Sequence, residues 1–212
     1  SDPNTANIIS SYTTGVISSY SLELMSQASM IPVKINIESR MYYNPELKSV
    51  YMFVPGIITI LLMLVSAMMT SISITREKEM GTMEALLVSP LKPIQIIIGK
   101  VMPYMLLSFI NLIVILLLAR FVFMMPVAGN LVLLLVESLL FILMSLALGI
   151  LISTISKTQQ QAMLLSMFAL MLPTILLSGF IFPIENMPMP LQYLSHIMPS
   201  KWFIIIVKNI ML

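Results

Sequence analysis

The chain has 212 residues, of which 58% are hydrophobic and 9% are charged, and its net charge is +2. A water-soluble domain carries roughly 25% charged residues, so much of this surface is expected to face lipid. The lack of cysteine excludes thiolate metal sites, the single histidine (His196) excludes a multi-histidine site, and scattered basic residues give no support for nucleic-acid binding.

The first fifty residues have the composition of soluble structure. Asp2-Pro3 is a typical helix start, and apolar residues follow at helical spacing toward Leu24. Residues 33–38 then alternate between apolar and polar, which predicts a strand. We expect residues 1–50 to be the end of an external domain with a small α/β character.

Four long apolar segments follow, and each is long enough for one helical crossing of a hydrocarbon core about 30 Å thick. They are continuously apolar rather than alternating, which favours helices over barrel strands. The sequence therefore predicts an all-α transmembrane domain over residues 51–212, a helix bundle. The expected helices are about 51–74, 96–124, 131–155 and 162–182.

The last thirty residues divide into two parts. Residues 183–200 contain four prolines and a short apolar face, which predicts a short helix lying in the outer membrane interface. Residues 202–212 are apolar but too few to cross a bilayer, so we expect the start of a truncated last helix.

Basic residues set the expected orientation. Arg76, Lys78 and Lys92 lie between the first two segments, and Lys157 lies between the third and fourth. Because basic loops favour the cytoplasm, these two loops are predicted to be cytoplasmic. Residues 1–50 and the segment 183–200 are then external.

The loop from Arg76 to Pro93 has the densest charge in the chain, and it predicts a short amphipathic helix over about 77–89. Gly81 allows the backbone to bend, Thr82 is suited to cap the helix that follows, and Glu77 and Glu84 are spaced to share one face. The other face is apolar, with Met80, Met83 and Leu87. By periodicity alone, a merely solvated connector explains the loop equally well.

The loop resembles the signature of type-2 ABC exporter permeases, Arg-Glu-x-Glu-x-Gly-Thr-x-Glu-x-Leu-x-x-Ser/Thr-Pro. Every fixed position is met, at Arg76, Glu77, Glu79, Gly81, Thr82, Glu84, Leu86, Ser89 and Pro90. Three further stretches resemble the same family in the same order: 43–49 followed by Val54-Pro55-Gly56, Gly99-Lys100, and 178–188. The similarity is greatest to subfamilies with a large external domain between the first two of six helices. It implies that residues 1–50 are the end of that domain, that residues 183–200 form the outer re-entrant segment, and that the first and last helices lie outside this chain.

The resemblance implies a transport subunit of the bacterial cytoplasmic (inner) membrane, paired with a second copy or a close homologue. The chain has no Walker-type lysine loop, so ATP and Mg²⁺ would be bound by a cytoplasmic ABC ATPase partner, and no catalytic site or cofactor is expected here. The loop would be the coupling helix seated on that ATPase. The residues expected to contribute to coupling with the ATPase are Glu77, Lys78, Glu79, Met80, Gly81, Thr82, Met83, Glu84 and Leu87.

Three polar residues within the apolar segments are candidates for a substrate pathway or a conformational latch: Asn111, Arg120 and Glu137. A structural ion pair, or extension of Arg120 to the headgroups, explains the two charges as well. An ion-coupled transporter or channel is the alternative function, and it would predict more charges in the bundle interior. An intramembrane enzyme lacks the residues that it would need.

Overall fold

The computed structural model describes residues 9, 11–20, 50–88, 90, 92–126, 128–182 and 184–211. It divides into two compact units, Ser1–Met52 and Phe53–Leu212. In the first unit, residues 11–20 are helical, within the stretch that the sequence predicts as a helix. The predicted strand at 33–38 lies outside the described residues.

The second unit is built from helices. Within the described part of the chain no residue is in a strand, which agrees with the all-α prediction. Among the residues that the structure describes, four segments are long and apolar enough to cross a membrane: Phe53–Glu79, Pro93–Phe121, Leu131–Ile155 and Gln159–Leu177. The elements are α2 (Val50–Glu79), α3 (Thr82–Val88), α4 (Pro93–Phe121), α5 (Leu131–Ile155), α6 (Gln159–Ser166), η1 (Met167–Met171), α7 (Leu172–Leu177), η2 (Ile184–Asn186), α8 (Met189–Ile197) and α9 (Pro199–Met211).

The first spanning helix is longer than the sequence predicts, and the loop helix is shorter. We expected a helix over 51–74 and a second over 77–89, whereas α2 continues to Glu79 and α3 begins at Thr82. The charged residues at 76–79 are good helix formers, so they extend α2 by one turn. The break comes at Gly81, whose φ of +73° lies in the left-handed region.

The fourth spanning segment is one continuous run of helix that changes type in its middle. α6 and α7 flank η1, a π-helical turn. Pro173 follows directly after this turn and has no N–H to donate. Its ring also crowds the carbonyl of Ala169, which gives a physical reason for the widened turn.

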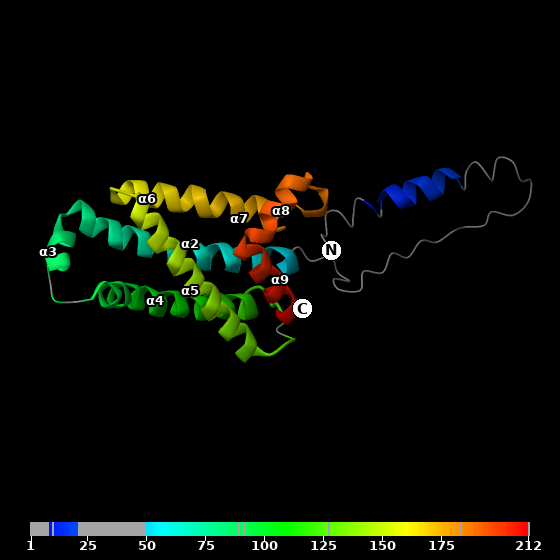
Figure 1. The fold of residues 1–212 in the computed structure, drawn as a ribbon. Coiled ribbons are helices and arrows are strands. Elements are labelled where there is room, and N and C mark those ends of the chain that lie inside the picture. The colour runs from blue at the N-terminus through cyan, green and yellow to red at the C-terminus, as the bar shows by residue number, and fades with distance from the viewer. Residues whose placement is uncertain are drawn as a thin grey trace, which may run out of the picture. The chain divides into compact units, whose positions relative to one another are not determined.

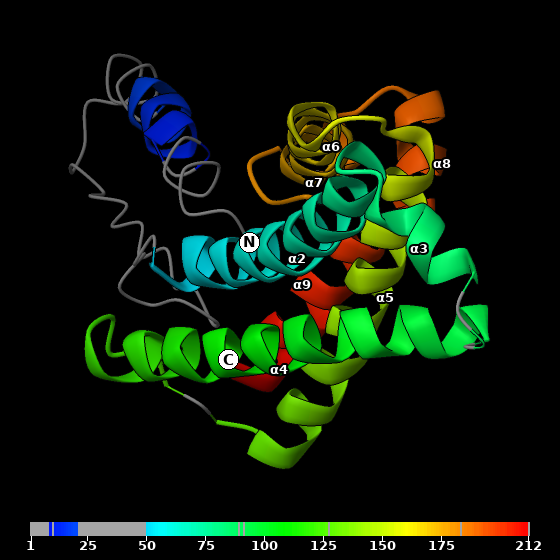
Figure 2. The same ribbon diagram turned by 90° about the vertical axis from the view of Figure 1, so that its left-hand side faces the viewer.

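α2 is the central helix of the bundle. Figures 1 and 2 show α2 lying between α4 on one side and α6 with α7 on the other. Hydroxyl pairs join it to both neighbours, with 2.8 Å between Ser66 and Ser108 and 2.8 Å between Ser71 and Ser166. Such interhelical bonds are a common means of helix association in lipid.

α5 crosses α2 at very close range. A Cβ placed on Gly149 would lie 2.4 Å from the carbonyl oxygen of Ala67, so only glycine fits at this crossing. α5 also packs on α9, where the rings of Phe141 and Phe203 stack with centroids 4.1 Å apart. α3 lies at one end of the bundle, and α8 lies at the opposite end (Figure 1).

Candidate functional site: the loop between α2 and α4

The turn between α2 and α3 contains only Met80 and Gly81. The Met80 amide donates to the Arg76 carbonyl at 2.9 Å, and the Thr82 hydroxyl donates to the Glu77 carbonyl at 3.3 Å. A Cβ on Gly81 would meet nothing within 4 Å, so the glycine is required by its conformation rather than by space. This short, bonded turn fixes α3 against the end of α2.

Three consecutive residues at the end of α2 contact three different helices. The first is Glu77, whose carboxylate forms an ion pair with Lys100 of α4. Both side chains are about three-quarters covered, with exposed fractions of 24% and 22%. The pair ties the end of α2 to the first turns of α4.

Lys78 contacts the end of α5. Its ammonium donates to the carbonyl of Ser153 and, at 3.4 Å, to that of Thr154. These carbonyls belong to the last turn of α5, where carbonyl groups have no partner within the helix and the helix dipole is negative. A cation is the complementary charge at this position.

Glu79 contacts the start of α6. One carboxylate oxygen accepts from the Gln159 amide at 2.9 Å and from its side-chain nitrogen at 3.0 Å. Gln159 is the first residue of α6, so its amide is one of the helix's unpaired donors, and the dipole there favours an anion. The Thr158 hydroxyl caps the same terminus by accepting from the Gln161 amide at 3.2 Å.

α3 itself points its polar groups away from the bundle. Met80 is 63% exposed, and Thr82 and Glu84 are also exposed, while Met83 is partly buried. Leu87 belongs to α3, but its side chain is outside the described part of the chain. Glu77 and Glu84 do not share a helical face, because Gly81 ends α2 between them.

The polar candidates in the membrane segments are dispersed. Asn111 is half-buried in α4, Arg120 is exposed near the end of the same helix, and Glu137 is half-buried in α5. Among the residues described by the structure, no ion pair joins Arg120 to Glu137. The same residues include no cluster of acidic residues and histidine that would hold a metal ion.

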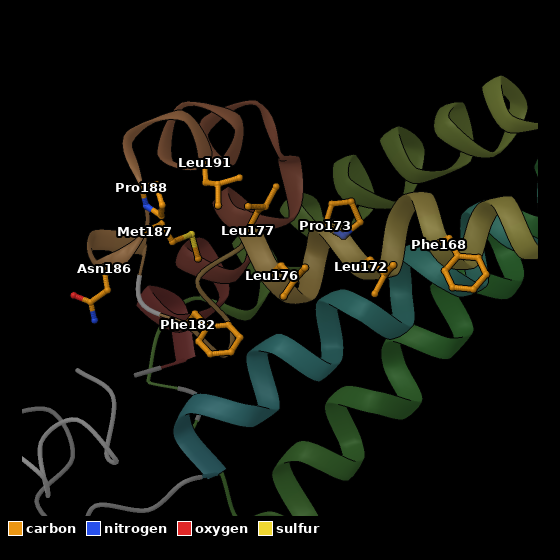
Figure 3. Close-up of a pocket in the computed structure, with 10 residues that line it drawn as sticks. All are labelled: Phe168, Leu172, Pro173, Leu176, Leu177, Phe182, Asn186, Met187, Pro188 and Leu191. Carbon is orange, nitrogen blue, oxygen red and sulfur yellow. The ribbon is translucent and has the colours of Figure 1, made fainter.

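Sequence reasoning missed an apolar pocket at the end of the bundle opposite α3 (Figure 1), with a volume of about 620 Å³ (Figure 3). One wall comes from η1 and α7 and the other from the segment that follows. Phe168, Leu172 and Leu176 recur every fourth residue, and this spacing is the signal that would have predicted the wall. The lining residues are Phe168, Leu172, Pro173, Leu176, Leu177, Phe182, Asn186, Met187, Pro188 and Leu191.

Comparison with known proteins gives consistent matches. A family model described as ABC-2 family transporter protein matches residues 1–212. The Escherichia coli (strain K12) protein named probable multidrug ABC transporter permease YbhS is 33% identical over 213 residues, covering 100% of this chain and 56% of the relative. The protein named probable multidrug ABC transporter permease YbhR, from the same strain, is 36% identical over 209 residues, covering 99% and 56%.

A more distant match is ABC transporter G family member 20 of Dictyostelium discoideum, 30% identical over 173 residues, covering 81% of this chain and 23% of the relative. The chain thus spans about half the length of the bacterial relatives, 56% in both cases. No solved structure gives a significant match to it.

Proposed function

The chain belongs to the ABC-2 family of transporter proteins, and from this we propose that it is the permease of an ATP-driven exporter whose ATPase is a separate subunit. Four helices able to span a membrane support the transport role. The observation that carries the coupling role is the loop at 76–93, which presents a short helix at one end of the bundle and binds three helices behind it.

The ATPase-facing surface of this proposal, called the outward side of α3, is defined by Met80 of the preceding turn and by Thr82 and Glu84 of α3. All three residues are exposed, and they combine an apolar, a hydroxyl and an acidic group. Because these three side chains are exposed, they are available to contact a partner, and the family resemblance of the loop is what favours an ATPase as that partner. ATP and Mg²⁺ are bound by the partner, and the conformational change of that ATPase is transmitted to this chain.

Glu77, Lys78 and Glu79 have a different part in this proposal. Their side chains are engaged within the permease, so they make the loop rigid instead of contacting the ATPase. A rigid loop is needed because a movement of α3 is transmitted to the membrane helices only if α3 does not bend independently of α2. Gly81 and Thr82 set the angle between α3 and α2.

The proposed setting is the cytoplasmic membrane of a bacterium, with α3 on the cytoplasmic side and residues 1–50 and α8 outside. The basic residues around α3 and Lys157 support this orientation. A second permease, identical or homologous, completes the transporter, and lipid surrounds it.

The apolar pocket supports a substrate with a large apolar part. Among the described residues that line it, Asn186 is the one uncharged polar side chain and none is charged. Such a lining binds a ligand mainly by removing its apolar surface from water, and it discriminates only weakly between ligands of related shape. An apolar or amphipathic compound is therefore the proposed cargo, in keeping with the multidrug designation of the two bacterial relatives.

The experiment that tests the coupling surface is charge reversal on α3. We expect Glu84→Lys to reduce copurification of the ATPase and its stimulation by the permease, without loss of membrane insertion. Tyr193→Lys on α8 is the control, because it also places a lysine at an exposed position, at the opposite end of the bundle (Figure 1). Unchanged stimulation in the Glu84→Lys variant would show that the ATPase does not use this surface.

A further inference from the structure

Lys78 and Glu79 contact the two sides of one connection. α5 ends at Ile155 and α6 begins at Gln159, so only residues 156–158 lie between the two helices. Lys78 binds carbonyls just before this connection, and Glu79 binds the amide just after it. Two neighbouring side chains of opposite charge therefore hold both ends of the same short link.

The groups that they bind are mainly backbone groups at helix ends. The last carbonyls of α5 and the first amides of α6 lack partners within their own helices. The signs are complementary at both ends, since a cation meets the negative end of one dipole and an anion meets the positive end of the next. Because the contacts reach the backbone, a displacement of α2's end acts on α5 and α6 themselves rather than on flexible side chains.

The same two residues are directly joined to α3. Only Met80 and Gly81 separate Glu79 from α3, and the Thr82 hydroxyl bonds back to the Glu77 carbonyl. A tilt of α3 is therefore passed to Lys78 and Glu79 through one short turn. Because the turn is short and hydrogen-bonded, little of the movement of α3 is expected to be lost within it.

On the far side, α6 continues through η1 and α7 to the apolar pocket. Five of the pocket's lining residues belong to this helix: Phe168, Leu172, Pro173, Leu176 and Leu177. π-helical turns and prolines are sites where helices bend, and here both lie between the clamped end and the outer end. Movement of α6's first turn is expected to shift the pocket wall about this point.

We propose that Lys78 and Glu79 form a clamp that makes the α5–α6 connection move with α3, so that ATPase movement reaches the pocket through α6 and α7. The clamp residues are positioning residues, which touch neither the ATPase nor the cargo. This inference rests on the proposed function, because it specifies how the coupling loop acts on the membrane helices.

The test uses the complete permease with its ATPase in nanodiscs, and spin labels at Val88 in α3 and Gln160 in α6. Both side chains are exposed, and the chain has no cysteine, so Val88→Cys and Gln160→Cys give specific labelling. In the otherwise unchanged protein, we expect a narrow distance distribution that keeps its mean between the nucleotide-free and ATP-bound states.

The decisive variant is the charge swap Lys78→Glu with Glu79→Lys, which keeps the net charge but places the wrong sign at each helix end. We expect it to broaden the distribution and to populate a detached state at least about tenfold more, because charge-assisted hydrogen bonds are lost. Lys78→Arg should preserve the narrow distribution. Lys157→Met is the matched control, since it removes a cation from the same connection without removing a clamp contact.

The outcomes separate the two proposals. If the ATPase fails to copurify with the unlabelled permease, the proposed function is wrong, and the clamp with it. If the ATPase binds and is stimulated but the charge swap leaves the distance distribution unchanged, only the clamp is wrong. If the charge swap prevents folding, the single change Lys78→Met is used in its place. The clamp predicts a broadened distance distribution for this variant, and an unchanged distance distribution would contradict the clamp.

Discussion

The crossing of α2 and α5 provides the sharpest structural prediction, because one missing methyl group determines it. Gly149→Ala adds a Cβ at 2.4 Å from the Ala67 carbonyl oxygen, and Cβ atoms are essentially never observed within 3.0 Å of another heavy atom. The two backbones must then separate by at least about 0.6 Å, the difference between those distances, and a close-packed interior does not absorb such a shift freely.

The expected cost combines two opposite effects. Overpacking of a filled interior costs about 1–3 kcal/mol. Replacing a helical glycine by alanine offsets about 1 kcal/mol of this through helix propensity. Gly99→Ala in α4 isolates the second effect, because a Cβ there would meet nothing within 4 Å. The difference in stability between the two variants should therefore be about 1–3 kcal/mol, the packing cost alone.

The assay is thermal unfolding of the complete permease in detergent, followed by the circular dichroism of its helices. For a chain of this size, that difference corresponds to an apparent melting temperature about 2–12 °C lower for Gly149→Ala than for Gly99→Ala, and the longer complete permease should show a smaller shift in the same direction. Equal melting temperatures for the two variants would refute the close crossing, because the packing cost expected only at Gly149 would then be absent.

Three further predictions concern the turn, the hydroxyl pairs and the pocket. Gly81→Ala forces a side chain into a left-handed conformation at a cost of about 1–2 kcal/mol, and it should lower ATPase stimulation, whereas Gly81→Asn should be milder in the same assay. Ser71→Ala breaks the bond to Ser166 and should cost only about 0.6 kcal/mol in a thermal melt, the average for such bonds in a membrane. Leu176→Trp should fill the pocket and reduce binding of an apolar fluorescent compound, while the ATPase still copurifies; unchanged binding would remove the pocket from the transport pathway.

The sequence carries enough information to predict the spanning helices, because each needs a long apolar run and little else. Residues 131–155 were predicted as a helix and form one with the same bounds. The ends of the spanning helices were harder to predict where polar residues with high helix propensity adjoin the apolar run. Residues 76–79 extend α2 beyond the apolar run, and α6, capped by Thr158, starts at Gln159, three residues before the predicted start at 162.

The partners of the loop residues depend on tertiary packing, and no local pattern encodes them. Periodicity places Glu77 and Glu84 on one face only if a single helix contains both, and the left-handed conformation of Gly81 separates them. The contact between Glu79 and Gln159 joins residues 80 positions apart. A single sequence gives no signal for such a pairing, although the charge signs at two helix ends are compatible with it.

The pocket escaped prediction for a related reason. Its apolar residues read as ordinary lipid-facing or core positions when each segment is considered alone. The cavity exists because the chain turns back after α7, with Gly179 at a φ of +76°, and brings Phe182, Met187 and Leu191 against that helix. The sequence shows the apolar residues of η1 and α7 at helical spacing, but it does not show that the following segment folds back against them.

The central claim is that the outward side of α3 contacts the ATPase, and site-specific crosslinking tests it most directly. A photoreactive group is placed at Glu84 in one variant and at Tyr193 on α8 in another, and each complete permease is irradiated with its ATPase in membranes. The account predicts an ATPase adduct from position 84 and none from position 193. Adducts from neither position, or from position 193 alone, would contradict it.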